Sequence, residues 1–150
     1  MPHTHHDHSN CLHTAMEKAE ALCSARKLRL TDGRKAVLKA LWQSHKAMTA
    51  AEITAKVKAK QPPLTYRALA FLREQGLVHH IGALDAYVGC PRAETQGHVS
   101  QLFVCRDCRD VEEIPAPGLE RSLRSHAEQH GFTMQETHLE VLGICQNCKA

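Results

Sequence analysis

The chain has 150 residues, 43% of them hydrophobic and 23% charged, a composition that supports a folded core and argues against wholesale disorder. No stretch approaches eighteen apolar residues and the N-terminus has no apolar run, so we expect no transmembrane helix, no secretory signal and a cytoplasmic location. Residues 1–91 carry thirteen Lys or Arg against seven Asp or Glu, whereas residues 92–150 carry six against nine. Unless it is ordinary surface variation, this asymmetry predicts two domains, the basic one suited to a polyanion.

The N-terminal half shows helix signals followed by a hairpin signal. Residues 1–10 are polar and rich in histidine, and we expect a disordered tail there. Thr31 is placed to cap a helix, the segment from Thr49 fits a capping box, and Gly76 suits a helix end. These signals predict helices over 11–27, 32–45, 50–60 and 63–75, and short strands over 77–81 and 85–88. Such an order describes a winged helix-turn-helix domain over residues 11–90, whose last helix is suited to the major groove of DNA.

A linker of turn-forming residues over 91–97 precedes a second, smaller unit over 98–150. Its patterns predict strands over 99–104, 110–114 and 133–143 and a helix over 118–130. A unit this small commonly needs a metal or oligomerisation for its stability. The predicted fold class is therefore α+β, with an N-terminal winged helix and a small C-terminal α/β domain.

Four of the seven cysteines form two Cys-x-x-Cys pairs, Cys105 with Cys108 and Cys145 with Cys148. The two-residue gap lets both thiolates of a pair reach one ion, and two pairs complete a tetrahedral Cys₄ zinc site. Such a site has no open coordination position, so its expected role is structural, and it contributes to folding. Redox dithiols or free thiols are the alternatives, but neither pair lies in a βαβ context.

A second group of metal-binding side chains brackets the predicted junction between the domains. It consists of His79, Cys90, His98 and Glu113. Taken singly, a cysteine at a strand end is usually a small hydrophobic residue, and a lone histidine is usually solvated. Taken together, two imidazoles, one sulfur and one carboxylate suit Zn²⁺ better than Fe²⁺ or Mn²⁺. A metal there would fix the angle between the domains.

Several motifs resemble the ferric uptake regulator superfamily. Residues 62–72, continued by 74–79, are similar to its recognition helix and wing, and Arg29-Leu30-Thr31-x-x-Arg34 is similar to the start of its second helix. The two cysteine pairs lie where the family places its structural zinc. The resemblance covers about residues 16–148 and is strongest to the zinc uptake regulator branch. That branch implies His79, Cys90, His98 and Glu113 as the ligands of a regulatory zinc.

The resemblance also implies a function. It implies a homodimer formed through the second domains, which binds palindromic operator DNA and represses zinc-uptake genes when zinc is plentiful. The DNA contacts that it implies are Thr65, Tyr66 and Arg67 in the recognition helix, with Arg29 and Arg34 on phosphates. Zn²⁺ is the implied cofactor, with one structural and one regulatory site per chain. No membrane, no small-molecule substrate and no enzymatic activity are expected.

Two departures from the family pattern bear on these expectations. Leu64 and Thr65 stand where the family usually has Thr-Val before Tyr-Arg, which leaves the base contacts open. The iron-sensing branch carries a dense histidine motif before the first cysteine pair, where this chain has only His98. His138 matches a family histidine that can belong to a further metal site, but its companions are not evident, and we expect a surface or interface residue.

Three other classes of function remain open from the sequence. A zinc enzyme would need an open coordination position and a separate general acid or base, which neither ligand set offers. A zinc storage or trafficking protein would explain the surplus of histidine and cysteine but not the winged-helix pattern. A sister metalloregulator tuned to another metal is the strongest alternative, because binding strength alone does not identify the physiological metal.

Overall fold

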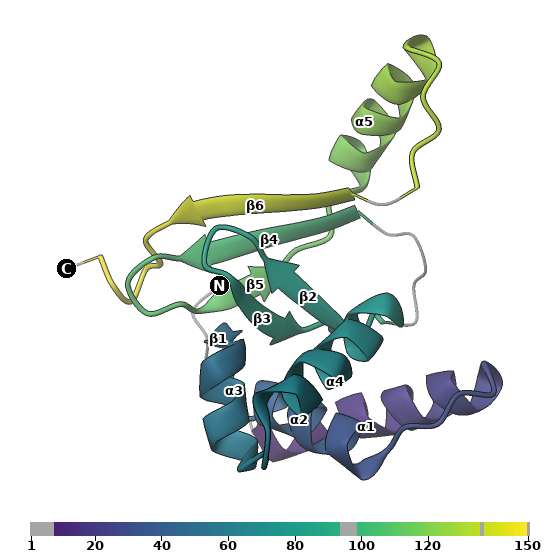
Figure 1. Cartoon of the computed structure of the whole chain (residues 1–150). Helices are drawn as coiled ribbons and strands as arrows, with labels where there is room; N and C mark the ends of the chain where they lie inside the picture. The colour runs from purple at the N-terminus through teal and green to yellow at the C-terminus, as the bar shows by residue number, and fades with distance from the viewer. Residues whose placement is uncertain (1–7, 94–98, 136, 150) are drawn as a thin grey trace.

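The computed structural model describes residues 8–93, 99–135 and 137–149, which form two units (Figure 1). In chain order the elements are α1 (His8–Ala25), α2 (Asp32–Trp42), β1 (Met48–Thr49), α3 (Ala50–Val57), α4 (Pro62–Glu74), β2 (Val78–Ile81), β3 (Ala86–Gly89), β4 (Val99–Cys105), β5 (Val111–Glu113), α5 (Pro117–Gln129) and β6 (Thr137–Gly143). None of the described helices is long and apolar enough to span a membrane. The predicted α+β fold, a winged helix followed by a small mixed domain, is confirmed.

Side-chain caps set the starts of helices α2 and α3 in the N-terminal unit. The Thr31 hydroxyl accepts a hydrogen bond from the Arg34 N–H at the start of α2. At α3, Thr49 and Glu52 form the predicted capping box. Gly76 takes a φ of +74°, which an L side chain rarely adopts, and turns the chain from α4 toward β2. The helices then bury one apolar core, whose most enclosed side chains include Leu38, Leu41, Ile53, Leu69 and Leu72.

The wing is a hairpin of β2 and β3, to which β1 adds a third, two-residue strand. All pairs in this sheet are antiparallel, with His79 opposite Val88. Just beyond β3, the Cys90 N–H donates to the Leu77 carbonyl, so this cysteine stays beside the start of β2. The wing therefore brings His79 and Cys90 to one end of the N-terminal unit.

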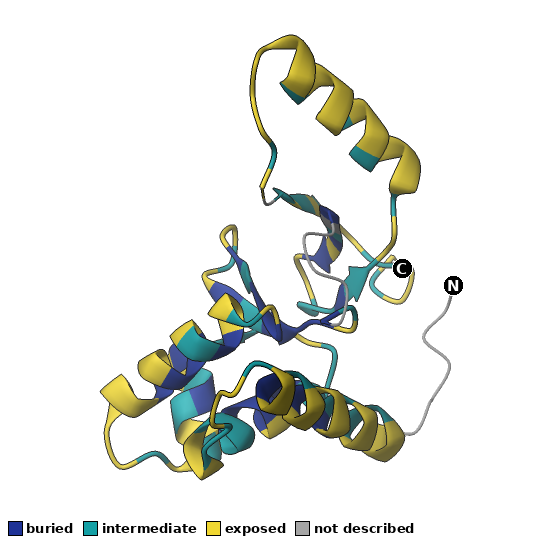
Figure 2. Ribbon diagram, turned by 90° about the vertical axis from the view of Figure 1, so that its right-hand side faces the viewer, coloured by how far each residue is buried: buried dark blue, intermediate teal, exposed yellow. Residues whose placement is uncertain are grey.

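The C-terminal unit is a sheet in the order β5-β4-β6. Strands β4 and β6 are parallel, with Cys105 paired to Gly143, so both cysteine turns leave the sheet at the same end. Strand β5 is antiparallel to β4 and places Glu113 opposite Leu102. Helix α5 stands away from the sheet and has no buried residue (Figure 2).

Some predicted boundaries are wrong. Residues 8–10 were expected in a disordered tail but form the first turn of α1, where the His8 ring lies 5.1 Å from the His45 ring. Residues 1–7 of that expected tail lie outside the described residues. Helix α2 ends at Trp42 rather than 45, because the following segment runs beside the C-terminal unit, where the His45 carbonyl accepts from the Val111 N–H. Helix α3 ends at Val57 because Lys58 takes a left-handed φ of 53°.

Candidate metal centres and nucleic-acid face

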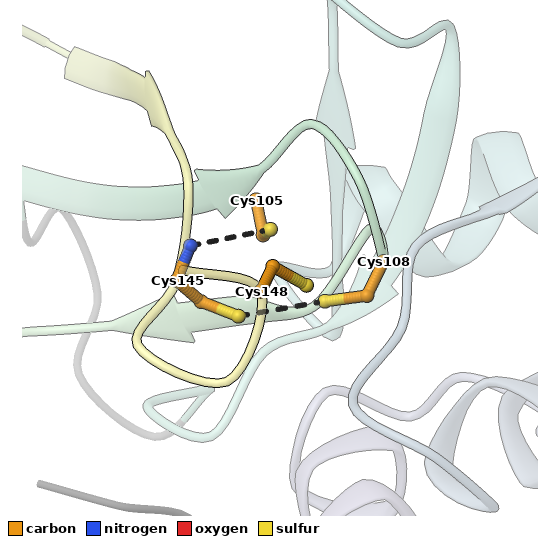
Figure 3. A group of neighbouring side chains, drawn as sticks. All are labelled: Cys105, Cys108, Cys145 and Cys148. Carbon is orange, nitrogen blue, oxygen red and sulfur yellow. Dashed lines mark hydrogen bonds between the residues drawn. The ribbon is translucent and has the colours of Figure 1, made fainter. Parts of the chain in front are cut away.

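The four paired cysteines meet at the end of the C-terminal sheet (Figure 3). Parallel pairing of β4 and β6 brings the two turns together, and all four sulfur atoms lie within 4.8 Å of one another. The Cys108 and Cys145 sulfurs are 3.7 Å apart, far beyond the roughly 2.05 Å of a disulfide. Two thiolates at about 2.3 Å from one tetrahedral zinc ion would be about 3.8 Å apart. The geometry therefore fits a closed Cys₄ zinc site.

The charges of this cluster also call for a cation. The backbone N–H groups of Cys108 and Cys145 lower the pKa of Cys105 to about 6. Hydrogen bonding with neighbouring sulfurs, that of Cys145 first, raises the pKa of Cys148 to about 12. One thiolate is thus favoured without a metal, whereas four are not. A divalent ion that neutralises them would make the turns one rigid unit.

The second candidate centre lies between the two units. His79 comes from β2, Cys90 from the end of the wing and Glu113 from β5. His79 Nε2 lies 2.9 Å from Glu113 Oε2, and the Cys90 thiol donates to the same oxygen at 3.6 Å. The side chains of His79 and Glu113 are only 5% and 2% exposed, and Cys90 is 4% exposed. The structure thus unites three of the four predicted regulatory ligands, while His98 lies outside the described residues.

Burial of these groups explains why they suit a metal. Burial, and then the neighbouring charge of Glu113, raises the pKa of the Cys90 thiol far above its usual value. Burying a carboxylate beside a thiol is costly unless a cation compensates the charge. The donor set of imidazole, sulfur and carboxylate fits Zn²⁺. Among the described residues, no third group of three or more potential ligands is this close.

His138, which the sequence predicted as a surface or interface residue, lies near this centre. The His138 ring lies 5.6 Å from the His79 ring, edge to face, although His138 is exposed on β6. Two residues along the same strand, the Glu140 carboxylate accepts from the N–H groups of Gly82 and Ala83 in the wing turn, at 2.7 and 3.1 Å. The two-residue period of a strand puts both side chains on one face. The sequence therefore places His138 and Glu140 on one face of the strand, but it does not show that this face meets the wing.

The predicted DNA-contacting side chains fall into three groups. Tyr66 is 56% exposed on α4, and Arg67 and Arg29 are exposed as well. Arg34 is half-buried, with its guanidinium 3.5 Å from the centre of the Phe71 ring, so part of its role is to fasten α2 to α4. Thr65 is only 1% exposed. The expectation that Thr65 touches DNA is therefore wrong for this conformation, because Thr65 lies on the core side of α4.

A winged helix joined to a second domain, with a closed thiolate cluster and a buried ligand set between them, defines a metal-responsive regulator of the winged-helix class. The ferric uptake regulator family model matches residues 25–142, and the chain belongs to this family. The chain is 35% identical over 138 residues to the zinc uptake regulation protein of Escherichia coli K12, with 89% of this chain and 80% of that protein covered.

Solved structures agree in fold. A zinc uptake regulator complexed with zinc and DNA superposes with a TM-score of 0.85 at 32% identity, covering 91% of this chain and 94% of that one. The crystal structure of holo XcZur gives 0.82 at 33% identity, with 91% and 97% covered. The apo form of XcZur gives only 0.54 at 32% identity, with 94% and 99% covered.

Proposed function

We propose that this protein is a cytoplasmic, zinc-responsive transcriptional repressor that binds operator DNA as a homodimer and represses genes for zinc uptake, with no enzymatic activity. The observation that carries the proposal is the buried set of His79, Cys90 and Glu113, which joins the DNA-binding unit to the C-terminal unit. The similarity to zinc uptake regulators supports both the metal and the output. We assign His98, which follows the linker, as the fourth ligand.

The ligand set explains how zinc would be sensed. Bound zinc supplies the positive charge that makes burial of a thiolate and a carboxylate favourable. His79 and Cys90 belong to the wing, whereas Glu113 belongs to β5, so these residues can share one ion only when the two units are close. Without the ion, the same buried groups favour separation and hydration. Zinc binding to these ligands therefore shifts the equilibrium toward one angle between the two units.

The relatives support this coupling of metal to domain angle. The holo and apo forms of XcZur have almost the same identity to this chain, 33% and 32%, yet TM-scores of 0.82 and 0.54. Sequence divergence therefore does not explain the difference, whereas a different arrangement of the units in the apo form would. The arrangement described here matches the holo form, so we take it as the conformation competent for DNA.

The exposed face of α4 that carries Tyr66 and Arg67, called the reading head from here on, points outward in this conformation. Tyr66 and Arg67 are exposed on α4, where a ring can pack on a thymine methyl and a guanidinium can bind guanine or phosphate. Arg29, exposed just before α2, and Arg34, in the first turn of α2, are the residues that we assign to phosphates. A dimer formed through the C-terminal units would present two such heads to a palindromic operator.

The test is a Cys90→Ser variant of the full chain, with Cys11→Ser as the matched control, because Cys11 belongs to neither cluster. The probe is a duplex selected by the zinc-loaded wild-type protein from a palindromic library. We expect the wild type and the control to hold two zinc ions per chain, and Cys90→Ser to hold one. Zinc-dependent affinity for the duplex should fall about a hundredfold, which corresponds to about 2.7 kcal/mol of coupling.

Two outcomes would overturn the proposal. Unchanged zinc-dependent DNA binding by Cys90→Ser would show that the site formed with His79 and Glu113 does not control DNA binding. The sulfur ligand disfavours Mn²⁺ and Fe²⁺, so we expect DNA binding to require less free Zn²⁺ than free Mn²⁺ or Fe²⁺. A wild-type protein that binds the duplex at a lower free concentration of Mn²⁺ or Fe²⁺ would be a sister regulator for another metal.

A further inference from the structure

The turn that carries the first cysteine pair touches the DNA-binding unit directly. Arg109, which follows Cys108, has a left-handed φ of 61°, and its N–H closes the turn onto the Cys105 carbonyl at 3.0 Å. Its own carbonyl accepts from the Ala47 N–H at 2.9 Å. Its guanidinium Nη1 donates to both carboxylate oxygens of Glu52, at 2.9 and 3.0 Å. The cysteine turn is thus attached to the winged helix by backbone and side chain.

The backbone contacts form a short antiparallel ribbon between the two units. Lys46 forms a bridge with Asp110, and the Val111 N–H donates to the His45 carbonyl at 3.0 Å. The ribbon starts beside the Cys₄ cluster, because the Cys105 N–H donates to the Asp110 carbonyl at 2.9 Å. On the other side, Lys46 lies two residues before β1, which leads directly into α3. This connection is separate from the set of His79, Cys90 and Glu113.

The contact between Arg109 and Glu52 matters for DNA binding because Glu52 also caps helix α3. The same carboxylate accepts from the Thr49 N–H at 2.8 Å and so caps the start of α3. Helix α3 packs against the recognition helix α4. A cation that holds Glu52 therefore holds the end of the helix that supports the reading head. Both side chains are about 40% exposed, so the ion pair alone is of modest strength.

We propose that Arg109 is a positioning residue for DNA binding. Through Glu52 and α3, it holds the reading head in a fixed orientation relative to the Cys₄ turn. The Cys₄ site then has a second task besides folding, because it fixes the backbone from which Arg109 reaches α3. The inference rests on the proposed function, and it adds a second point of control on the domain angle. Exposed ion pairs are individually weak, so we expect losses of about threefold per protomer and on the order of tenfold for a dimer.

The experiment compares zinc-loaded full-length Arg109→Ala with Arg106→Ala, which removes the same charge from an exposed residue of the same turn. The probe is the duplex selected by the wild-type protein, and zinc content is measured throughout. Arg109→Ala should keep two zinc ions per chain, bind the duplex about tenfold more weakly, and speed hydrogen exchange at the Ala47 and Val111 amides. Arg106→Ala should stay close to the wild type in all three.

A double-mutant cycle with Glu52→Gln isolates the pair from the helix cap. The combined variant should bind DNA about as well as the weaker single variant. The slope of affinity against salt concentration should not change in Arg109→Ala, since a positioning residue touches no phosphate.

Additive losses, wild-type affinity in Arg109→Ala, or a slope reduced by about one phosphate contact would each overturn the inference. A wild-type protein that binds no DNA would refute the proposed function instead, while the exchange rates at Ala47 and Val111 would still test the lock.

Discussion

At the scale of single residues, Thr65 shows how a side chain in the recognition helix serves the fold. It is 1% exposed, and its hydroxyl has no hydrogen-bond partner among the described residues. An unpaired buried hydroxyl costs on the order of 1 kcal/mol or more. Replacement by valine keeps the shape and removes the polar group, so Thr65→Val should raise the free energy of unfolding by about 1 kcal/mol. Urea denaturation of the zinc-loaded protein measures the change.

Thr65→Ser is the control for this prediction. Serine keeps the hydroxyl but loses a buried methyl group, so this variant should be less stable than the wild type. Neither substitution should change affinity for the selected duplex, because the side chain faces the core. A loss of DNA affinity in Thr65→Val, with stability unchanged, would return Thr65 to the set of DNA contacts.

At the scale of elements, β6 and the wing turn are joined by one carboxylate. Glu140 accepts two backbone hydrogen bonds from Gly82 and Ala83, so Glu140→Ala leaves the turn without its acceptor. We expect weaker binding to the selected duplex, and a smaller loss for Glu140→Gln, whose amide oxygen still accepts one bond. Glu128→Ala, which removes the same charge from exposed α5, should match the wild type. Equal affinity of Glu140→Ala and Glu128→Ala would show that the contact does not orient the wing.

The elements also show what a sequence discloses. Caps and periodicity are local, so the starts of α2 and α3 at Thr31 and Thr49 were predictable. Strand β1 was missed because two residues are too few to show an alternating apolar pattern. It is defined only by its pairing with β3, which lies far along the sequence. The ribbon from His45 was likewise missed, since its partner lies more than sixty residues away. Three of the four predicted zinc ligands, which the structure brings together, were predictable because residue type and the family resemblance mark them. Arg109 and Glu140, by contrast, resemble ordinary surface charges until their partners are known.

At the scale of the whole molecule, the C-terminal unit leaves apolar surface uncovered. Phe103 and Val141 are paired across β4 and β6 and are 39% and 44% exposed, and Ile144 beyond β6 is 41% exposed. Helix α5 adds Leu119, and Phe132 just after it is 72% exposed. Phe103, Val141 and Ile144 line one pocket, and an exposed apolar patch of this kind marks an interaction site. It is the face that a second copy of the chain would cover in the proposed homodimer.

Val141→Asp places a charge in the middle of that surface and should shift the protein from dimer to monomer in sedimentation velocity. Operator affinity should fall with it, because a monomer offers one reading head to a two-fold site. Leu28→Asp makes the same kind of change at a 37% exposed position of the N-terminal unit and should leave the dimer intact. A Val141→Asp protein that sediments as a dimer would place the interface elsewhere. Zinc content should stay at two ions per chain in both variants, since neither residue belongs to the ligand sets.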